Sequence, residues 1–313
     1  MKKFIAILVS FVLLCGCAFA ETGIFAQGGS GAQLNDEYYM QVSEGETDAL
    51  VRIARDGYAY VALRAEEFGG MVVSEAALYY LMRTEGTWVL MSSAGGRTET
   101  VYTFAEGVEV SDIGARDGLI FVLVDGRLHI LYPQYAMCIQ LSGVLMESYV
   151  IEDDYAYYIS ADDRVSYMLS DGAGNIAETD AGKLCRVNMS TGRYEVLLED
   201  GAEGLQYTEG NLYFHYFADR YLTGTGDDMT IDGRLYSYDI TGGKVEKQTD
   251  MYDWEFFADE NGVYVLRREA IVALSGSMET IVCAVPQVVE VVEAGDSFVV
   301  FDARNMTFGV IAK

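Results

Sequence analysis

A short motif repeats along the chain and constrains its fold more than any other feature. In each copy a turn or small residue precedes two or three aromatic or β-branched residues. The copies centre on Tyr38, Tyr79, Ile120, Tyr157, Tyr213, Tyr264 and Val299. Their spacings of 41, 41, 37, 56, 51 and 35 residues give a period near 40 with two insertions. A period of this length indicates repeated units that pack on their neighbours.

Each period contains further strand-like runs separated by turn residues. A second run follows the motif, as in Gly233 to Tyr238, and a third follows a polar turn, as in Glu195 to Leu198. A fourth run, such as Val144 to Ile151, precedes the next motif. Long segments with helical periodicity are absent, and only Glu75 to Met82 is ambiguous. Four short strands per period are typical of a β-propeller blade.

The repeat predicts an all-β fold, a β-propeller of seven four-stranded blades. Six or eight blades and other all-β arrangements are the alternatives. The last repeat ends after two runs, Phe298 to Phe301 and Thr307 to Ile311. We expect N-terminal strands at Ile24 to Gln27 and Gly31 to Asn35 to complete that blade, which would close the ring and protect its edges. Residues 21–313 would then form a single domain.

The motif and its following runs resemble a known group of repeats. The segments Tyr155 to Gly192 and Gly210 to Gly243 are similar to bacterial extracellular domains related to the YWTD-type propeller of the low-density lipoprotein receptor. The resemblance implies a recognition propeller, usually non-enzymatic. The Tyr-Trp-Thr-Asp tetrad itself is absent, and Trp88 and Trp254 stand outside the motif. The resemblance therefore supports the fold more than a function.

The first 20 residues have the pattern of a secretory signal peptide. Lys2 and Lys3 precede an apolar run from Phe4 to Leu14, and small residues end at Ala20. That run is too short to span a membrane, and no later segment is long enough. We therefore expect a secreted or cell-envelope protein with no transmembrane span in the mature chain. Cys17, in a lipobox-like context, offers an alternative in which the mature protein is lipid-anchored.

The charge of the chain excludes one class of partner. Lys and Arg number 21 against 48 Asp and Glu, which gives a formal net charge of -27. Such a charge repels phosphate backbones, so nucleic-acid binding is excluded. We expect a monomer whose partner is an extracellular protein, a glycan or a small molecule.

The two insertions are the candidate binding region. They run from Ala161 to Ala181 and from Phe217 to Ile231, in adjacent blades, so we expect them to stand side by side. Binding residues concentrate on such loops. The candidate ligand-binding residues are Asp171, Asn175, Asp180, Asp219, Tyr221, Asp227 and Asp228. Acidic oxygens suit a cationic or sugar-like ligand or a calcium ion, although Gly and Asp residues also simply make solvated turns.

Catalytic motifs are missing from the sequence. His129 and His215 are the two histidines, and each lies in a predicted strand where packing is the expected role. The cysteines Cys138, Cys185 and Cys283 also lie in strand-like runs and are expected to be small buried hydrophobic residues. We therefore predict a non-enzymatic protein without a cofactor. The alternative is a carbohydrate-active enzyme, a glycoside hydrolase or lyase, with acidic residues at the propeller channel.

Overall fold

The computed structural model describes residues 25–43, 47–251, 253, 255–267, 270–276, 278–285, 289–302 and 307–313. The predicted signal peptide, residues 1–20, and Cys17 lie outside the described residues, so export and lipid anchoring stay predictions. Within the described ranges, no helix has the length and apolar character needed to cross a membrane.

The described chain is built from antiparallel β-sheets, as the repeat predicts. The first sheet in chain order contains β2 (Gly31–Leu34), β3 (Glu37–Ser43), β4 (Asp48–Ala54) and β5 (Ala59–Ala65). The second contains β6 (Glu67–Ser74), β7 (Ala77–Thr84), β8 (Thr87–Ala94) and β9 (Arg97–Thr103). The third contains β1 (Ala26–Gln27), β10 (Val110–Arg116), β11 (Leu119–Val124), β12 (Arg127–Tyr132) and β13 (Met137–Gln140), with the 3-10 turn η1 (Pro133–Tyr135).

The second half of the chain continues the pattern. A seven-stranded sheet contains β14 (Met146–Glu152), β15 (Tyr155–Ser170), β16 (Ile176–Asn188), β17 (Tyr194–Thr208), β18 (Asn211–Thr223), β19 (Thr230–Asp239) and β20 (Val245–Lys247), with η2 at Gly226–Asp228. A four-stranded sheet follows with β21 (Glu255–Asp259), β22 (Gly262–Arg267), β23 (Ala270–Ser275) and β24 (Met278–Ala284). The last sheet has three strands, β25 (Val289–Ala294), β26 (Ser297–Asp302) and β27 (Thr307–Ala312).

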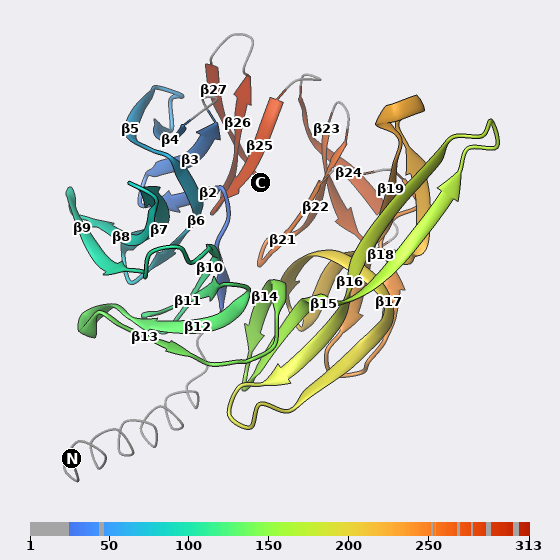
Figure 1. The fold of residues 1–313 in the computed structure, drawn as a ribbon. Coiled ribbons are helices and arrows are strands. Elements are labelled where there is room, and N and C mark those ends of the chain that lie inside the picture. Colours follow the sequence, from blue (N-terminus) through green and yellow to red (C-terminus); the bar gives the residue numbers. More distant parts are fainter. Residues whose placement is uncertain are drawn as a thin grey trace.

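The sheets stand around a common centre, the arrangement of a β-propeller (Figure 1). Their innermost strands contact one another in turn, from β2 to β6, β10, β14, β17 and β21. The last sheet meets the first through β25 and β2. Tyr38 donates its hydroxyl hydrogen to Asp296 at 3.1 Å across this junction, and Arg55 donates to the same carboxylate at 3.2 Å.

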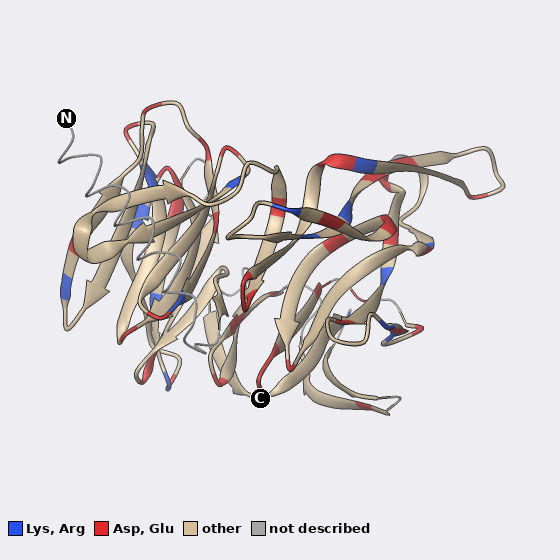
Figure 2. Ribbon diagram, turned by 90° about the horizontal axis from the view of Figure 1, so that it is seen from below, with Lys and Arg blue, Asp and Glu red and all other residues tan. Residues whose placement is uncertain are grey.

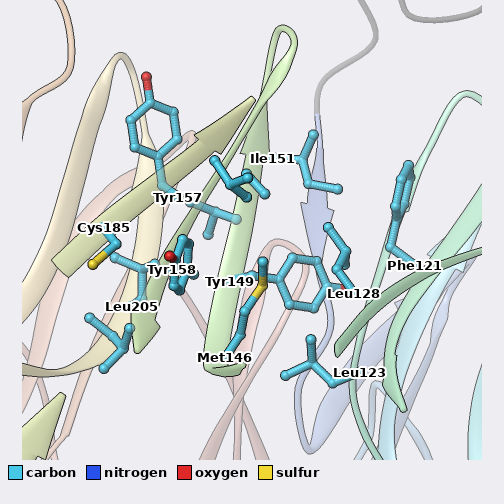
Figure 3. Packing of buried hydrophobic residues seen from close by; sticks show 14 of the residues in the cluster. Phe121, Leu123, Leu128, Met146, Tyr149, Ile151, Tyr157, Tyr158, Cys185 and Leu205 are labelled. Carbon is cyan, nitrogen blue, oxygen red and sulfur yellow. The ribbon is translucent and has the colours of Figure 1, made fainter. Parts of the chain in front are cut away.

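The core lies between neighbouring sheets, which explains the apolar motif at the centre of each repeat. All seven motif centres lie in strands, and β11, with the sequence Leu-Ile-Phe-Val-Leu-Val, is buried along most of its length. A strand covered on both faces needs such a continuous apolar run. Between the third and fourth repeats, Phe121, Leu128, Met146 and Tyr149 pack together (Figure 3). Glu75 to Met82, ambiguous in sequence, is a turn followed by β7.

The expected closure by N-terminal strands is wrong. Both predicted strands form, but β1 pairs with β10 of the third sheet, and β2 is the inner strand of the first sheet. Neither pairs with the last sheet, which has three strands among the described residues. The reason is that each run that precedes a motif pairs with that motif, as β6 pairs with β7. Each sheet therefore begins one strand earlier than the repeat predicts. The first and last sheets meet instead by side-chain packing, for example of Tyr38 and Met40 with Val292 and Val299.

The N-terminal segment crosses the inside of the ring. The Gly28 amide donates to the Ile113 carbonyl of β10 at 2.7 Å, and Gly29 exchanges hydrogen bonds with Met71 of β6. A Cβ atom on Gly28 would lie 2.3 Å from the Ile113 oxygen, so only glycine allows this approach. The Gln27 side-chain amide then donates to the Leu205 carbonyl of β17 at 2.7 Å. The segment therefore connects sheets that are far apart in sequence.

The cysteines lie in strands, as expected. Cys185 is buried in β16, and Cys138 and Cys283 are partly buried in β13 and β24. Burial raises the pKa of the Cys138 thiol and of the Cys185 thiol to about 11. Thiols with so high a pKa carry little thiolate at neutral pH and are poor nucleophiles.

Candidate functional site

A cavity with a volume of about 1310 Å³ lies at the centre of the ring. Its wall comes from the inner strands of the sheets and from the N-terminal segment 25–33. The acidic side chains on this wall are Asp112, Glu147, Glu152, Asp153, Glu209, Glu255, Asp259, Glu260, Glu293 and Asp296. Arg116 is the one basic residue among the described lining residues. The cavity is therefore strongly acidic.

Burial shifts the protonation of several of these carboxyl groups. Removal from water raises the pKa of Asp112 to about 7, although the Tyr149 amide, 3.3 Å away, donates a hydrogen bond that lowers it. Burial, and then the nearby carboxylate of Glu290, raises the pKa of Glu255 to about 7. Glu255 is exposed on the cavity wall, where atoms of neighbouring strands surround it. These groups keep their protons to higher pH than usual because burial disfavours the charged form.

A buried lysine ammonium contacts two of the acids that line the cavity. Lys313 Nζ contacts the carboxylates of Asp259 and Glu293 and donates to the Gly295 carbonyl at 2.7 Å. It also lies 5.4 Å from the ring centroid of Phe298. The Lys313 side chain is only 3% exposed. Carboxylates and an aromatic face together thus hold a buried primary ammonium here.

The two acids that hold this ammonium have opposite pKa shifts. Burial raises the pKa of Glu293 to about 7, against the opposing charge of Lys313. For Asp259, burial acts in the same direction, but hydrogen bonds from Glu293 and Lys313 outweigh it and lower the pKa. Asp259 is therefore the more acidic of the two groups, and Glu293 keeps its proton to higher pH.

The two insertions are long β-hairpins rather than loops (Figure 1). One extends β15 and β16, and the other extends β18 and β19. They stand side by side, as the sequence predicts, and share a small apolar cluster that contains Tyr167, Phe217 and Ile231. The Tyr167 and Phe217 rings stack with centroids 5.4 Å apart. The Arg220 guanidinium lies over the Tyr167 ring, 4.7 Å from its centroid.

In the first hairpin the predicted site residues are engaged with their own backbone. Asp171 accepts hydrogen bonds from the Ala173 amide at 2.7 Å and from the Asn175 side chain at 2.6 Å. The hydrogen bond from Asn175 is the largest cause of the lowered pKa of Asp171. Asp180 lies farther along β16, where its carboxylate accepts from Ser166 at 3.4 Å. Asp171 and Asn175 therefore shape the hairpin turn, and their role as ligand-binding residues stays a prediction.

In the second hairpin the predicted residues lie apart from one another. Asp219 is held by Lys247, which lowers its pKa, and by the Tyr236 hydroxyl at 3.1 Å. Asp228 is exposed in η2, and the side chain of Asp227, in the same turn, lies outside the described residues. Tyr221 is buried and lines a second, small cavity. The hairpins do not bring the predicted residues into one pocket.

Sequence reasoning missed the acids of the central cavity as a group. Acidic positions are spread over the sheets (Figure 2), so no local pattern marks those that face the centre. It also assigned His215 to packing, whereas His215 Nε2 lies 3.1 Å from Asp253 Oδ2 beside the second cavity. His129 behaves as expected, within β12, where Nδ1 lies 2.8 Å from the Arg127 carbonyl. No three described His, Cys, Asp or Glu side chains are placed to hold a metal ion together.

No family model and no curated protein matches this chain. Among solved structures, the extracellular domain of a protein described as a one-component system from B. thetaiotaomicron is similar, with a TM-score of 0.57 and 11% identity, over 91% of this chain and 38% of that one. The dihydro-heme d1 dehydrogenase NirN gives 0.52 and 12%, over 92% and 67% of the two chains. The acylaminoacyl peptidase of Pyrococcus horikoshii gives 0.50 and 12%, over 87% and 49%. At these identities the likeness shows the fold alone.

Proposed function

We propose that the chain is an exported recognition propeller of seven blades that binds a cationic ligand in its central cavity. The count of seven follows if the seven-stranded sheet is divided at β17. The first part of β17 pairs with β16 and its second part with β18, so each part serves a different four-stranded unit. With the five remaining sheets, residues 25–313 would form a single domain of seven blades.

One observation carries the proposed ligand class: the cavity wall is lined with carboxyl groups and contains one described basic residue, Arg116. A concave wall of one charge sign concentrates ions of the opposite sign. A bound cation would also restore ionisation of groups such as Asp112 and Glu255, whose pKa values burial raises to about 7. The contact of the Lys313 ammonium with two of the lining acids, Asp259 and Glu293, supports this choice of ligand.

Two features support a role outside the cytoplasm. Residues 1–20 have the pattern of a signal peptide, and one protein of similar fold is described as an extracellular domain. Lipid anchoring through Cys17 is the alternative form of the mature protein.

The fold does not decide between binding and catalysis, because two of the similar structures are enzymes by name. The non-enzymatic proposal rests on the absence of a catalytic motif from the sequence.

The proposal is tested with spermine as a cationic probe, measured by isothermal titration calorimetry. We expect the double variant Glu255→Gln with Glu260→Gln to weaken spermine binding by about tenfold or more, because it removes two cavity acids, one of which a bound cation would ionise. The matched control is Glu85→Gln with Glu106→Gln, which removes the same charge from exposed turns outside the cavity wall. Equal weakening in both double variants would show that net charge, rather than the cavity, attracts spermine.

A second candidate function is glycoside cleavage in the same cavity. The observation that favours it is the raised pKa of Glu255 on a wall that holds further carboxyl groups, since a general acid needs a raised pKa. The directly hydrogen-bonded pair of Asp259 and Glu293 is too close together for the two carboxyl groups of a glycosidase. Hydrolysis of any member of a glycoside panel by the wild type, lost in Glu255→Gln, would replace the binding proposal with this one.

A further inference from the structure

A second cavity, of about 170 Å³, lies at the base of the β18–β19 hairpin. It is lined by Glu203, His215, Tyr221, Asp232, Gly233 and Asp253. The strand pairing explains the space, because the register of β18 shifts between Tyr216 and Arg220 opposite Gly233. A Cβ atom on Gly233 would lie 2.8 Å from the Tyr216 nitrogen, so a larger residue would disturb this wall. The cavity shares no lining residue with the central one.

A buried carboxylate with an unused oxygen marks this cavity. The Asp253 side chain has no exposed area, and its Oδ2 is 3.1 Å from His215 Nε2. Its other oxygen, Oδ1, is buried and has no hydrogen-bond partner among the described residues. A buried carboxylate oxygen without a donor is costly, because it has lost its water and gained nothing in return. This oxygen therefore calls for a donor beyond those that the described residues provide.

The described basic side chains nearby are held mainly by other partners. Both terminal nitrogens of Arg267 donate to Glu279, at 2.6 and 2.7 Å, and its charge also acts on Asp253. The Arg267 Nε is buried without a hydrogen-bond partner among the described residues. Arg234 lies 4.8 Å from the centroid of the Tyr221 ring and donates to the Asp250 carbonyl. Neither lines the cavity, whereas the acids Glu203 and Asp232 do, together with Asp253. The cavity wall is thus anionic.

The size of the cavity and its acidic lining favour one class of ligand. The described residues contain no group of three side chains placed to bind a metal ion, which disfavours a bare divalent cation. A liquid water occupies about 30 Å³, so the cavity has room for roughly five waters, or for one small charged group with a short apolar stem. A primary ammonium offers three donors, which match the unused Asp253 oxygen and its acidic neighbours.

We propose that this cavity binds the primary ammonium end of a small alkylamine, with Asp253 as its main acceptor. His215 positions the Asp253 carboxylate through Oδ2 and leaves Oδ1 for the ligand. His215 is itself fixed by edge-to-face contact with Phe256, at a centroid distance of 5.0 Å. The arrangement parallels the carboxylate cage around the Lys313 ammonium, but here no described side-chain ammonium lines the cavity. The inference does not depend on cation binding in the central cavity.

The test uses n-butylammonium as the probe and the full chain, with binding measured by calorimetry. We expect binding to the wild type and a loss of about tenfold or more in affinity in Asp253→Asn, because a charged hydrogen bond becomes a neutral one. The matched control is Glu106→Gln, an exposed acid outside both cavities. The isosteric neutral probe n-butanol is expected not to bind.

A second measurement covers the case in which Asp253→Asn does not fold. On the wild-type protein, we expect nuclear Overhauser contacts between the butylammonium methylenes and the rings of Tyr221 and His215. The proposal is overturned if butylammonium does not bind, if it binds Asp253→Asn as tightly as the control, or if Ca²⁺ alone binds in an Asp253-dependent manner. The double variant Glu255→Gln with Glu260→Gln separates the two cavities, because it should weaken spermine binding and leave butylammonium binding unchanged.

Discussion

At the scale of single residues, the main feature is the cost of burying unpaired acids. Asp112 faces the central cavity with a pKa raised to about 7, from an ordinary value of 3.8. Between these two values the folded protein keeps a proton that the unfolded chain releases. Folding stability therefore falls as the pH rises from about 4 to about 7 and then levels off. Glu255 and Glu293, whose pKa values are also about 7, act in the same direction.

The variant Asp112→Asn tests this cost. Asparagine is neutral at all pH values and tolerates the positive φ of 48° at this position. We expect the variant to raise the Tm by roughly 2–4 °C at pH 8, where the wild-type carboxylate is ionised, and to change it much less at pH 5. Thermal unfolding at both pH values measures the difference, with Glu106→Gln as the control. An equal shift at the two pH values would attribute the effect to backbone conformation alone.

At the scale of the elements, the two insertions gain order by packing on each other. A two-stranded hairpin is marginally stable alone, and the apolar cluster of Tyr167, Phe217 and Ile231 gives each hairpin a partner. Phe217 is 1% exposed although it lies in an insertion. The hairpins thus form one small unit beside the ring.

The substitution Phe217→Ala should separate this unit. Removal of a buried phenylalanine costs about 3–5 kcal/mol, and we expect most of the loss to appear as local opening. Amide exchange in residues 162–180 and 220–231 should accelerate by about tenfold or more, while β11 keeps its protection. Tyr194→Ala, which removes a ring that is 62% exposed, is the control. Unchanged exchange in both hairpins would show that they are stable independently.

The sequence was sufficient to predict the strands but not which of them belong to the same sheet. Apolar runs such as Leu119 to Val124 are long and regular enough to identify each strand. The predicted grouping of strands into sheets was wrong because the length of a connection does not show where one sheet ends and the next begins. Only Glu66 separates β5 from β6, which belong to different sheets. The acids of the central cavity could not be grouped from the sequence either, because residues from Asp112 to Asp296 come together only once the ring forms.

At the scale of the whole molecule, the N-terminal segment connects several sheets on the inside of the ring. Residues 25–29 join the third sheet through β1, touch β6 through Gly29, and reach β17 through the Gln27 side chain. Phe25 packs against Phe121 and Tyr149, with centroids 6.1 and 5.7 Å away. The same segment forms part of the cavity wall. Ring stability and the shape of the cavity are therefore coupled.

Two neighbouring glycines allow a matched test of this coupling. Gly28→Ala places a Cβ atom 2.3 Å from the Ile113 oxygen, whereas a Cβ on Gly29 meets nothing within 4 Å. We expect Gly28→Ala to cost about 1–3 kcal/mol of folding free energy, as overpacking does, and Gly29→Ala to remain close to the wild type. Chemical denaturation measures both. Equal stability of the two variants would mean that the segment is not tightly held.

The internal crossing also has a consequence for the order of assembly. Gln27 and Leu205 are hydrogen-bonded across a separation of 178 positions, and contacts of such long range form late in folding. The portion of the chain that a ribosome makes early must wait for sheets that are made much later. We therefore expect it to dock on a nearly complete ring, so that the acidic cavity takes its final shape in the last step of folding.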